Sequence, residues 1–200
     1  MLKPCIVIGI TGGISSGKST FSRLLHDLTA APLFDADRAA HDLTDNDPEV
    51  GRLLTEEFGD EIFSPNGVLN RAALRAIVFA DSEKKRALEQ ILHPRIRRQW
   101  STAAEESRQS GQLFLADIPL LYETEGESLC DCVVVVACSN EIQQQRLMAR
   151  ARLSAAAALS MIKSQMPLPQ KISRADHLIW NNGPLTVLEA QAEILARCWS

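Results

Sequence analysis

A glycine-rich segment with one lysine, close to the start of the chain, has the residue types and spacing that bind phosphate groups. It matches the pattern G-x-x-x-x-G-K-[ST] at every required position, with the sequence Gly12-Gly13-Ile14-Ser15-Ser16-Gly17-Lys18-Ser19. Glycines let the backbone turn tightly, so that successive N–H groups point at phosphate oxygens. A chance turn that contains a lysine is the alternative. The apolar run before the segment and the helical pattern after it favour a phosphate-binding loop, or P-loop.

Lys18 and Ser19 supply the charged and hydroxyl groups that such a loop uses. The Lys18 ammonium would reach the β- and γ-phosphates of ATP, and the Ser19 hydroxyl would bind Mg²⁺. Few protein ligands are needed, because Mg²⁺ keeps several of its waters. The ATP-binding residues expected in this part of the chain are Gly13, Ile14, Ser15, Ser16, Gly17, Lys18, Ser19 and Thr20.

Carboxylates follow two of the apolar runs. Asp35 and Asp37 end one run, and they would point the same way if the chain stays extended. One of them could orient an acceptor hydroxyl and take its proton, although aspartate is also common as a cap or turn residue. Asp117 ends a second run, where it could bind Mg²⁺ directly or through water, or serve only the structure.

Arg146 and Arg150 share one helical face with Gln143, at the spacing i, i+3, i+7. Guanidinium groups stay charged and offer forked donors, which suits a phosphoryl group in transfer. Such arginines on a mobile lid would neutralise charge only when the lid closes. A solvated basic face is the alternative reading.

These residues need strands and helices in alternation to position them, which predicts an α/β fold with a central parallel sheet. The expected strands lack polar alternation and so suit burial on both faces; they are Ile6–Ile10, Pro32–Asp35, Leu113–Asp117, Cys132–Ala137 and His177–Trp180. The expected helices are Lys18–Leu28, Pro48–Phe58, Arg71–Phe79, Ser82–Leu92, Pro94–Ser107, Asn140–Arg150, Ser154–Gln165 and Leu185–Cys198. His93-Pro94 is interpreted as a helix boundary, because proline restricts the residue before it.

The composition fits one compact globular domain. The chain has 200 residues, of which 46% are hydrophobic and 23% charged, and a net charge of -4. This balance argues against a general nucleic-acid or membrane surface, and no run of about 18 apolar residues or signal segment occurs. The five cysteines form no CxxC pair, so reduced core thiols and a cytoplasmic location are expected. We expect a monomer or a weak homo-oligomer.

Several further segments follow the P-loop in a selective order, among them Asp35-Ala36-Asp37, His93-Pro94-Arg95-Ile96, Asp117-Ile118-Pro119-Leu120-Leu121-Tyr122-Glu123, Gln143-x-x-Arg146-Leu147-x-x-Arg150, Gln165-Met166-Pro167, Ala175-Asp176 and Asn181-x-Gly183. Together with the P-loop they resemble the dephospho-CoA kinase family over nearly the whole chain. The family carries out the last step of coenzyme A synthesis. The resemblance implies a three-layer P-loop NTPase fold with a five-stranded sheet. It also implies a core at about 1–40, 111–139 and 169–200, a helical acceptor-binding insertion at about 41–110 and a lid at about 140–168.

The resemblance also implies roles for residues. Asp37 matches the proposed catalytic base, Arg146 and Arg150 match the lid arginines, and Asn181 joins the ATP site. The residues expected around dephospho-CoA, whose ribose 3′-hydroxyl would be phosphorylated, are Thr11, Asp35, Asp37, His93, Arg95, Pro119, Leu120 and Tyr122. Two rivals keep the P-loop: another small-molecule kinase, for nucleoside monophosphates or shikimate, and a non-catalytic regulatory module. The chain departs from the family at Ser15, where glycine is usual, and at Trp180, where an acidic or polar residue is common.

Overall fold

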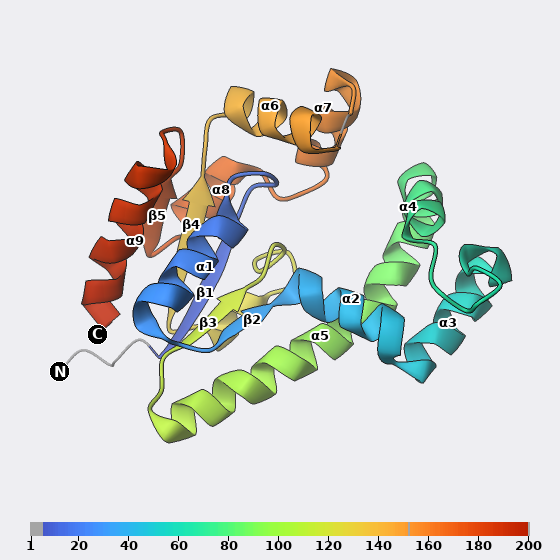
Figure 1. Ribbon diagram of the computed structural model, residues 1–200, viewed down its shortest axis with the longest axis horizontal. Coiled ribbons are helices and arrows are strands. Elements are labelled where there is room, and N and C mark those ends of the chain that lie inside the picture. Colours follow the sequence, from blue (N-terminus) through green and yellow to red (C-terminus); the bar gives the residue numbers. More distant parts are fainter. Residues whose placement is uncertain (1–5, 152, 200) are drawn as a thin grey trace. The chain divides into compact units, whose positions relative to one another are not determined.

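The computed structural model describes residues 6–151 and 153–199, and only the backbone of Arg150 and Ala151. Within these residues the chain forms two compact units (Figure 1). The first unit, here called the sheet unit, comprises the residues up to Asp35 together with those from Ser101 onward. The second, here called the helical unit, is Ala36–Trp100.

The sheet unit is built on five parallel strands, as the apolar runs predict. The strands are β1 (Val7–Gly12), β2 (Leu33–Asp35), β3 (Phe114–Asp117), β4 (Cys132–Ala137) and β5 (His177–Trp180). Their order across the sheet is β2-β3-β1-β4-β5. The connections β1–β2, β2–β3 and β4–β5 contain α-helices, whereas β3–β4 contains the 3-10 turn Gly126–Leu129. This register sets Asp35 of β2 beside Asp117 of β3, and Ile10 of β1 on the other side of Asp117.

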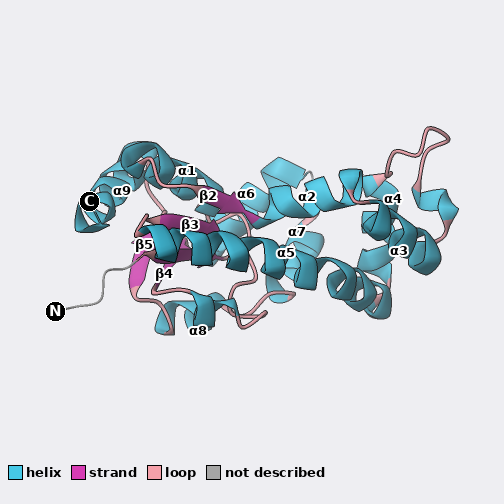
Figure 2. Ribbon diagram, turned by 90° about the horizontal axis from the view of Figure 1, so that it is seen from below, coloured by secondary structure: helices cyan, strands magenta, loops and turns pink. Residues whose placement is uncertain are grey.

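Helices cover both faces of this sheet (Figure 2). Helix α1 (Lys18–Thr29) and helix α9 (Leu185–Trp199) lie side by side on one face, and the short helix α8 (Leu168–Ser173) lies on the other, against β4. Burial on both faces explains why the strands are uniformly apolar. The core between the sheet, α1 and α9 is formed mainly by Ile8, Ile10, Phe21, Leu25, Leu115, Val134, Val136, Ile179, Leu188 and Ala192.

The helical unit has a separate apolar core. It contains α2 (Ala36–Asn46), α3 (Pro48–Phe58), α4 (Arg71–Ala80), the 3-10 turn Asp60–Ile62 and the first part of α5 (Ser82–Ser110). Asp47 begins α3 by accepting from the backbone N–H groups of Glu49 and Val50, and Asn70 accepts from the N–H of Ala73 at the start of α4. The buried residues of this core are Leu43, Val50, Leu54, Phe58, Ile62, Leu69 and Leu74.

Helix α5 corrects one prediction, because it continues through His93-Pro94 instead of ending there. An internal proline removes one backbone N–H and costs about 3 kcal/mol or more. Leu88 and Ile91 before the proline and Ile96 after it all pack on the helical core, which favours one continuous helix. The Arg95 guanidinium adds a bond to the Ile91 carbonyl oxygen at 2.9 Å.

Smaller differences concern helix ends and cysteines. Helices α2 and α8 were not predicted, and α7 (Ala155–Lys163) begins after Ser154, which is its N-cap. Cys132 and Cys138 are buried, whereas Cys198 is exposed, so the expectation of a core thiol is wrong for Cys198; Cys5 lies outside the described residues. In the described part of the chain, no helix is long and apolar enough to cross a membrane.

Candidate active site

The P-loop joins β1 to α1 and contains two residues with left-handed backbone. Gly17 has φ 97° and Ser15 has φ 57°. A Cβ atom at Gly17 would also collide with the side-chain amide of Asn181, so glycine is required there twice over. Ser15 has the positive φ angle that a glycine would adopt easily. The serine at this position, where glycine is usual in the family, thus does not remove the left-handed turn.

Lys18 and Asp117 form an ion pair at the base of this loop. The Asp117 side chain is only 2% exposed and that of Lys18 is 11% exposed. Burial raises the pKa of Asp117, the Lys18 ammonium lowers it, and the neighbouring Asp35 raises it again. The lysine that the P-loop motif assigns to phosphate is thus held by the carboxylate that the sequence suggested as a Mg²⁺ ligand.

Three buried polar atoms at the loop have no hydrogen-bond partner among the described residues: Ser15 Oγ, Ser16 Oγ and Gln143 Oε1. An unpaired buried polar group costs about 1–3 kcal/mol, so a partner is expected when the site is used. Hydroxyl donors fit phosphate oxygens. The exposed Ser19 hydroxyl and the Asp117 carboxylate are oxygen donors of the kind that Mg²⁺ prefers. The residues present therefore fit a phosphate chain and its Mg²⁺ ion.

Helix α6 (Asn140–Ala151) contributes side chains to the same loop. Arg146 Nη1 donates to the Ser16 carbonyl oxygen at 3.4 Å, and Asn181 Nδ2 donates to it at 2.8 Å. The Gln143 amide lies over Gly13, where an added Cβ atom would collide with it. The side chain of Arg150, the other expected lid arginine, lies outside the described residues.

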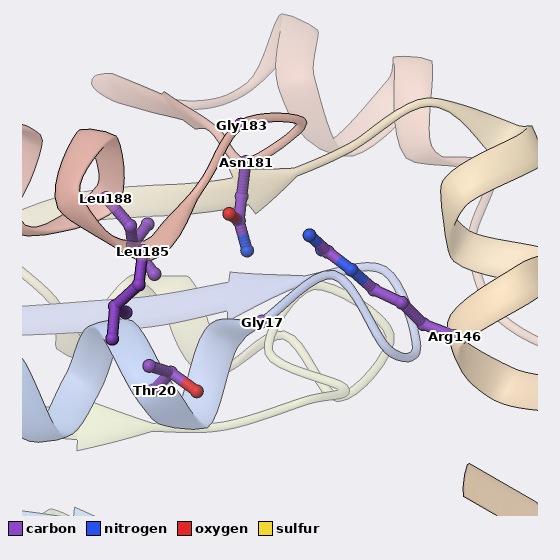
Figure 3. Close-up of a pocket in the computed structure, with 7 residues that line it drawn as sticks. All are labelled: Gly17, Thr20, Arg146, Asn181, Gly183, Leu185 and Leu188. Carbon is purple, nitrogen blue, oxygen red and sulfur yellow. The ribbon is translucent and has the colours of Figure 1, made fainter. Parts of the chain in front are cut away.

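A pocket of about 280 Å³ opens beside the loop (Figure 3). In this view Arg146 and Asn181 point toward one another near Gly17, while Thr20 and Leu185 lie further along α1 and α9. The structure thus brings together four of the residues expected to bind ATP. The residues that line the pocket are Gly17, Thr20, Arg146, Asn181, Gly183, Leu185 and Leu188.

The residues expected around the acceptor are divided between the two units. In the sheet unit, the Thr11 hydroxyl donates to the Pro119 carbonyl oxygen at 3.0 Å. Tyr122 is buried, its hydroxyl donates to the Arg174 carbonyl oxygen at 2.9 Å, and the Arg174 guanidinium lies 4.2 Å from the centre of its ring. Leu120 is partly buried on the same loop.

In the helical unit, Asp37 is exposed in the first turn of α2, two residues after Asp35. Arg95 pairs with Glu49 at 3.1 Å. Burial lowers the pKa of His93, with Glu89 opposing this effect and Lys85 adding to it. The lowered pKa favours the neutral imidazole, which can accept as well as donate a hydrogen bond.

Three further residues at the site were missed or only partly recognised in the sequence. Lys171 is fully buried beside the P-loop, yet a lysine in a short polar segment gives no signal of burial. Gln165 accepts from the Ile14 N–H at 3.1 Å; the sequence singled it out only through the resemblance. Gln143 was placed on the correct helical face, but its contact with Gly13 required the fold.

Comparison with known proteins agrees with this geometry. The family model described as dephospho-CoA kinase matches residues 6–186. The chain belongs to the dephospho-CoA kinase family. It is 38% identical to a dephospho-CoA kinase of Bacillus cereus over 196 residues, which is 98% of each protein. The chain is therefore a kinase.

Two solved structures extend the likeness to the whole fold. A crystal structure of a Thermus thermophilus protein has a TM-score of 0.75 and 38% identity, covering 98% of both chains. The dephospho-CoA kinase from Campylobacter jejuni has a TM-score of 0.68 and 27% identity, covering 97% of both chains. The expected P-loop kinase fold with its five-stranded parallel sheet is confirmed.

Proposed function

We propose that the chain transfers the γ-phosphoryl group of ATP to the ribose 3′-hydroxyl of dephospho-CoA, forming coenzyme A and ADP, the last step of coenzyme A synthesis. One observation carries the nucleotide half of this proposal. The P-loop holds a buried Lys18–Asp117 ion pair together with two hydroxyl groups that lack partners among the described residues. Family membership supplies the acceptor.

The phosphates of ATP would lie in the P-loop, with the base in the pocket beside Asn181. Lys18 would exchange Asp117 for the phosphate oxygens, since a phosphate chain carries more negative charge than one carboxylate. The hydroxyl groups of Ser15 and Ser16 and backbone N–H groups of the loop would donate to the same oxygens. The N–H groups of Ile14, Ser16 and Thr20 are not among them, because they donate to Gln165, Gly13 and Gly17. Arg146 and Arg150 would add charge from the lid side.

Ser19 and Asp117 would hold Mg²⁺, Asp117 directly or through water. When bound, the ion neutralises charge that develops on the phosphate oxygens. Asp117 can take this role because it is released when Lys18 turns to the phosphates.

Asp37 would act as the general base. The acceptor oxygen attacks the γ-phosphorus, the bond from this phosphorus to the β–γ bridging oxygen breaks, ADP leaves, and the hydroxyl proton passes to the Asp37 carboxylate. The residues that would surround dephospho-CoA are Thr11, Asp35, His93, Arg95, Pro119, Leu120 and Tyr122. The regions 41–110 and 140–168 would then serve as acceptor-binding insertion and lid of a cytoplasmic monomer or weak homo-oligomer.

The proposal is tested by ADP release from Mg²⁺-ATP with dephospho-CoA, AMP, shikimate or no acceptor. Stimulation by dephospho-CoA alone, with a 3′-phosphorylated product, is expected. Stimulation by another acceptor would keep a P-loop kinase and reject the acceptor. ATP binding with no stimulation by any acceptor would favour the regulatory module.

Asp37→Asn tests the base. Nearly the same shape is kept and the proton acceptor is lost, so we expect kcat to fall by about 10²–10⁴-fold while the Kd for ATP stays unchanged. Asp27→Asn, an exposed aspartate on α1, is the matched control and should leave kcat unchanged. A kcat within about threefold of wild type in Asp37→Asn would remove Asp37 from the mechanism.

A further inference from the structure

Lys171 is an unusual lysine, because its side chain is completely buried. Its exposed fraction is 0%, although it lies on the six-residue helix α8 near the chain surface. Within the residues that the structure describes, Asp117 and Lys171 are the charged residues in the buried class. A buried ammonium group needs partners for its charge and for its three N–H donors.

Three acceptors surround the Lys171 ammonium. Its Nζ atom donates to Glu123 Oε1 at 2.9 Å, to the Pro119 carbonyl oxygen at 2.9 Å and to the Gly12 carbonyl oxygen at 3.5 Å. An ammonium has three N–H groups and no acceptor, so these contacts use its full capacity. Because the group is buried and saturated, it does not itself reach a phosphate.

The acceptors identify what Lys171 connects. Gly12 is the last residue of β1 and the first glycine of the P-loop, and Pro119 follows Asp117 by two residues on the loop after β3. The Thr11 hydroxyl donates to the same Pro119 carbonyl oxygen. Lys171 therefore joins the two strand ends that carry the phosphate loop and the Asp117 carboxylate.

Neighbours of Lys171 strengthen this connection. Glu123 Oε1 also accepts from the Met166 N–H at 2.9 Å, and Gln165 Oε1 accepts from the P-loop N–H of Ile14 at 3.1 Å. The segment 165–171 is thus bonded to the P-loop and to the loop 118–123 at both of its ends. Movement of this segment would displace both loops.

Burying a charged pair does not by itself stabilise a protein, because loss of hydration offsets the attraction, and an apolar replacement of similar volume is often neutral or stabilising. Methionine has nearly the length of lysine and would fill the same space. The three directed bonds of the ammonium, by contrast, fix the distance between two backbone carbonyl groups. The structure therefore favours a role for Lys171 in holding the two loops in position over a role in stabilising the fold.

We propose that Lys171 is a positioning residue for phosphoryl transfer, which holds the P-loop and the Asp117 loop in register through Gly12, Pro119 and Glu123. The inference rests on the proposed kinase function and adds a residue that does not contact either substrate. A displacement of about 1 Å of reacting groups can cost about 10²-fold in rate. Loss of Lys171 should therefore disturb ATP binding through Gly12 and the acceptor side through Pro119.

The test compares Lys171→Met with wild type for kcat, for the Kd of ATP by calorimetry, for the KM of dephospho-CoA and for the midpoint of thermal unfolding. We expect kcat to fall at least about tenfold and the Kd of ATP to rise. The KM of dephospho-CoA should rise as well, because Pro119, Leu120 and Tyr122 are proposed to surround that substrate. Arg197→Met is the matched control, since Arg197 belongs to an exposed ion pair with Glu193 on α9. It should change none of these values.

A double variant separates position from folding. In Lys171→Met alone, Glu123 keeps a charge without its ammonium and the fold can suffer; Lys171→Met/Glu123→Gln removes this charge as well. A double variant that unfolds like wild type but keeps the low kcat supports the proposal. A double variant that recovers stability and kcat together overturns it, as does an unchanged kcat and ATP Kd in Lys171→Met. If wild type fails to turn over dephospho-CoA, the proposed function falls, while the Kd of ATP still decides the role of Lys171.

Discussion

At the scale of single residues, Ser15 shows how local strain and function meet in the P-loop. Its left-handed backbone costs an L-residue about 1–2 kcal/mol, and its hydroxyl is buried without a partner among the described residues. Glycine would remove both costs, but it would lower the stability by about 0.5–1 kcal/mol because it loses more conformational entropy on folding. The loop without nucleotide is therefore less stable than its glycine form would be.

Ser15→Gly should consequently stabilise the nucleotide-free protein. We expect a gain of about 1 kcal/mol, which corresponds to about 2–4 °C in the thermal midpoint for a chain of this size. Ser15→Ala is the control, because it removes the hydroxyl and keeps the backbone strain, and it should gain less. A midpoint for Ser15→Gly below that of Ser15→Ala would show that the left-handed turn is not strained. Calorimetry without ATP measures both.

Lys18→Met should abolish turnover and make stability depend on pH in a defined way. Without the ammonium, the buried Asp117 carboxylate loses its partner, a change that costs about 3–5 kcal/mol in buried pairs. Burial already raises the folded-state pKa of Asp117 above 3.8, and loss of Lys18 raises it further. The folded variant thus binds a proton more readily than the unfolded chain, so the loss of stability shrinks as the pH falls from 7 toward 4.

Urea unfolding of wild type and Lys18→Met between pH 7 and pH 4.5 measures this effect. The difference in unfolding free energy should narrow as the pH falls. Lys18→Met/Asp117→Asn provides the control, because it has no carboxylate to protonate and should show no such narrowing. If the difference in unfolding free energy between wild type and Lys18→Met did not change with pH, the Asp117 carboxylate would not be a buried charge in the variant.

At the scale of elements, the contact between helix α6 and the P-loop leads to a prediction at Gly13. An added Cβ atom there would collide with the Gln143 amide, so Gly13→Ala should displace α6 or the loop and weaken ATP binding about tenfold or more. Gly13→Ala/Gln143→Ala restores the space and should recover part of the affinity. Gly51→Ala, where no atom lies within 4 Å of the added Cβ, is the control and should leave the affinity unchanged.

The elements also show what the sequence can predict. Buried parallel strands are apolar along their whole length, so all five were located, with ends that differ by at most two residues. Helix α2 was not predicted because its buried residues are mostly small: they are Ala36, Ala39, Thr44 and Leu43, and only Leu43 among these has a large apolar side chain. Continuity of α5 through Pro94 depended on the packing of Leu88, Ile91 and Ile96 against the core of the helical unit, which outweighs the local signal of proline.

The site divides in the same way. Lys18 and Ser19 could be predicted from the P-loop motif, and Asp117 from its place at the end of a strand, because each of these signals lies within a short segment. Lys171 could not be found from spacing, since its acceptors come from residues 12, 119 and 123, which lie 48 or more positions away. A buried ion pair leaves no periodic pattern in either of the segments that form it.

At the scale of the whole molecule, the two units carry different parts of the proposed reaction. The sheet unit contains the P-loop, Asp117, Arg146 and the pocket beside Asn181. The helical unit contains Asp37, His93 and Arg95 and has a core of its own. Some proposed acceptor residues, such as Thr11 and Pro119, also lie in the sheet unit, so protection of amides in the helical unit is what should distinguish dephospho-CoA from ATP.

Hydrogen exchange with single substrates tests this division. Mg²⁺-ATP alone should slow exchange in residues 12–20 and in the lid region 140–168, because phosphate contacts reduce local opening there. Dephospho-CoA alone should slow exchange within 41–110. Asp37→Asn serves as control, since it should preserve both patterns while turnover falls. Protection of 41–110 by ATP but not by dephospho-CoA would contradict the assignment of this region to the acceptor. The helical unit would then belong to the nucleotide site, and the acceptor would have to bind elsewhere on the chain.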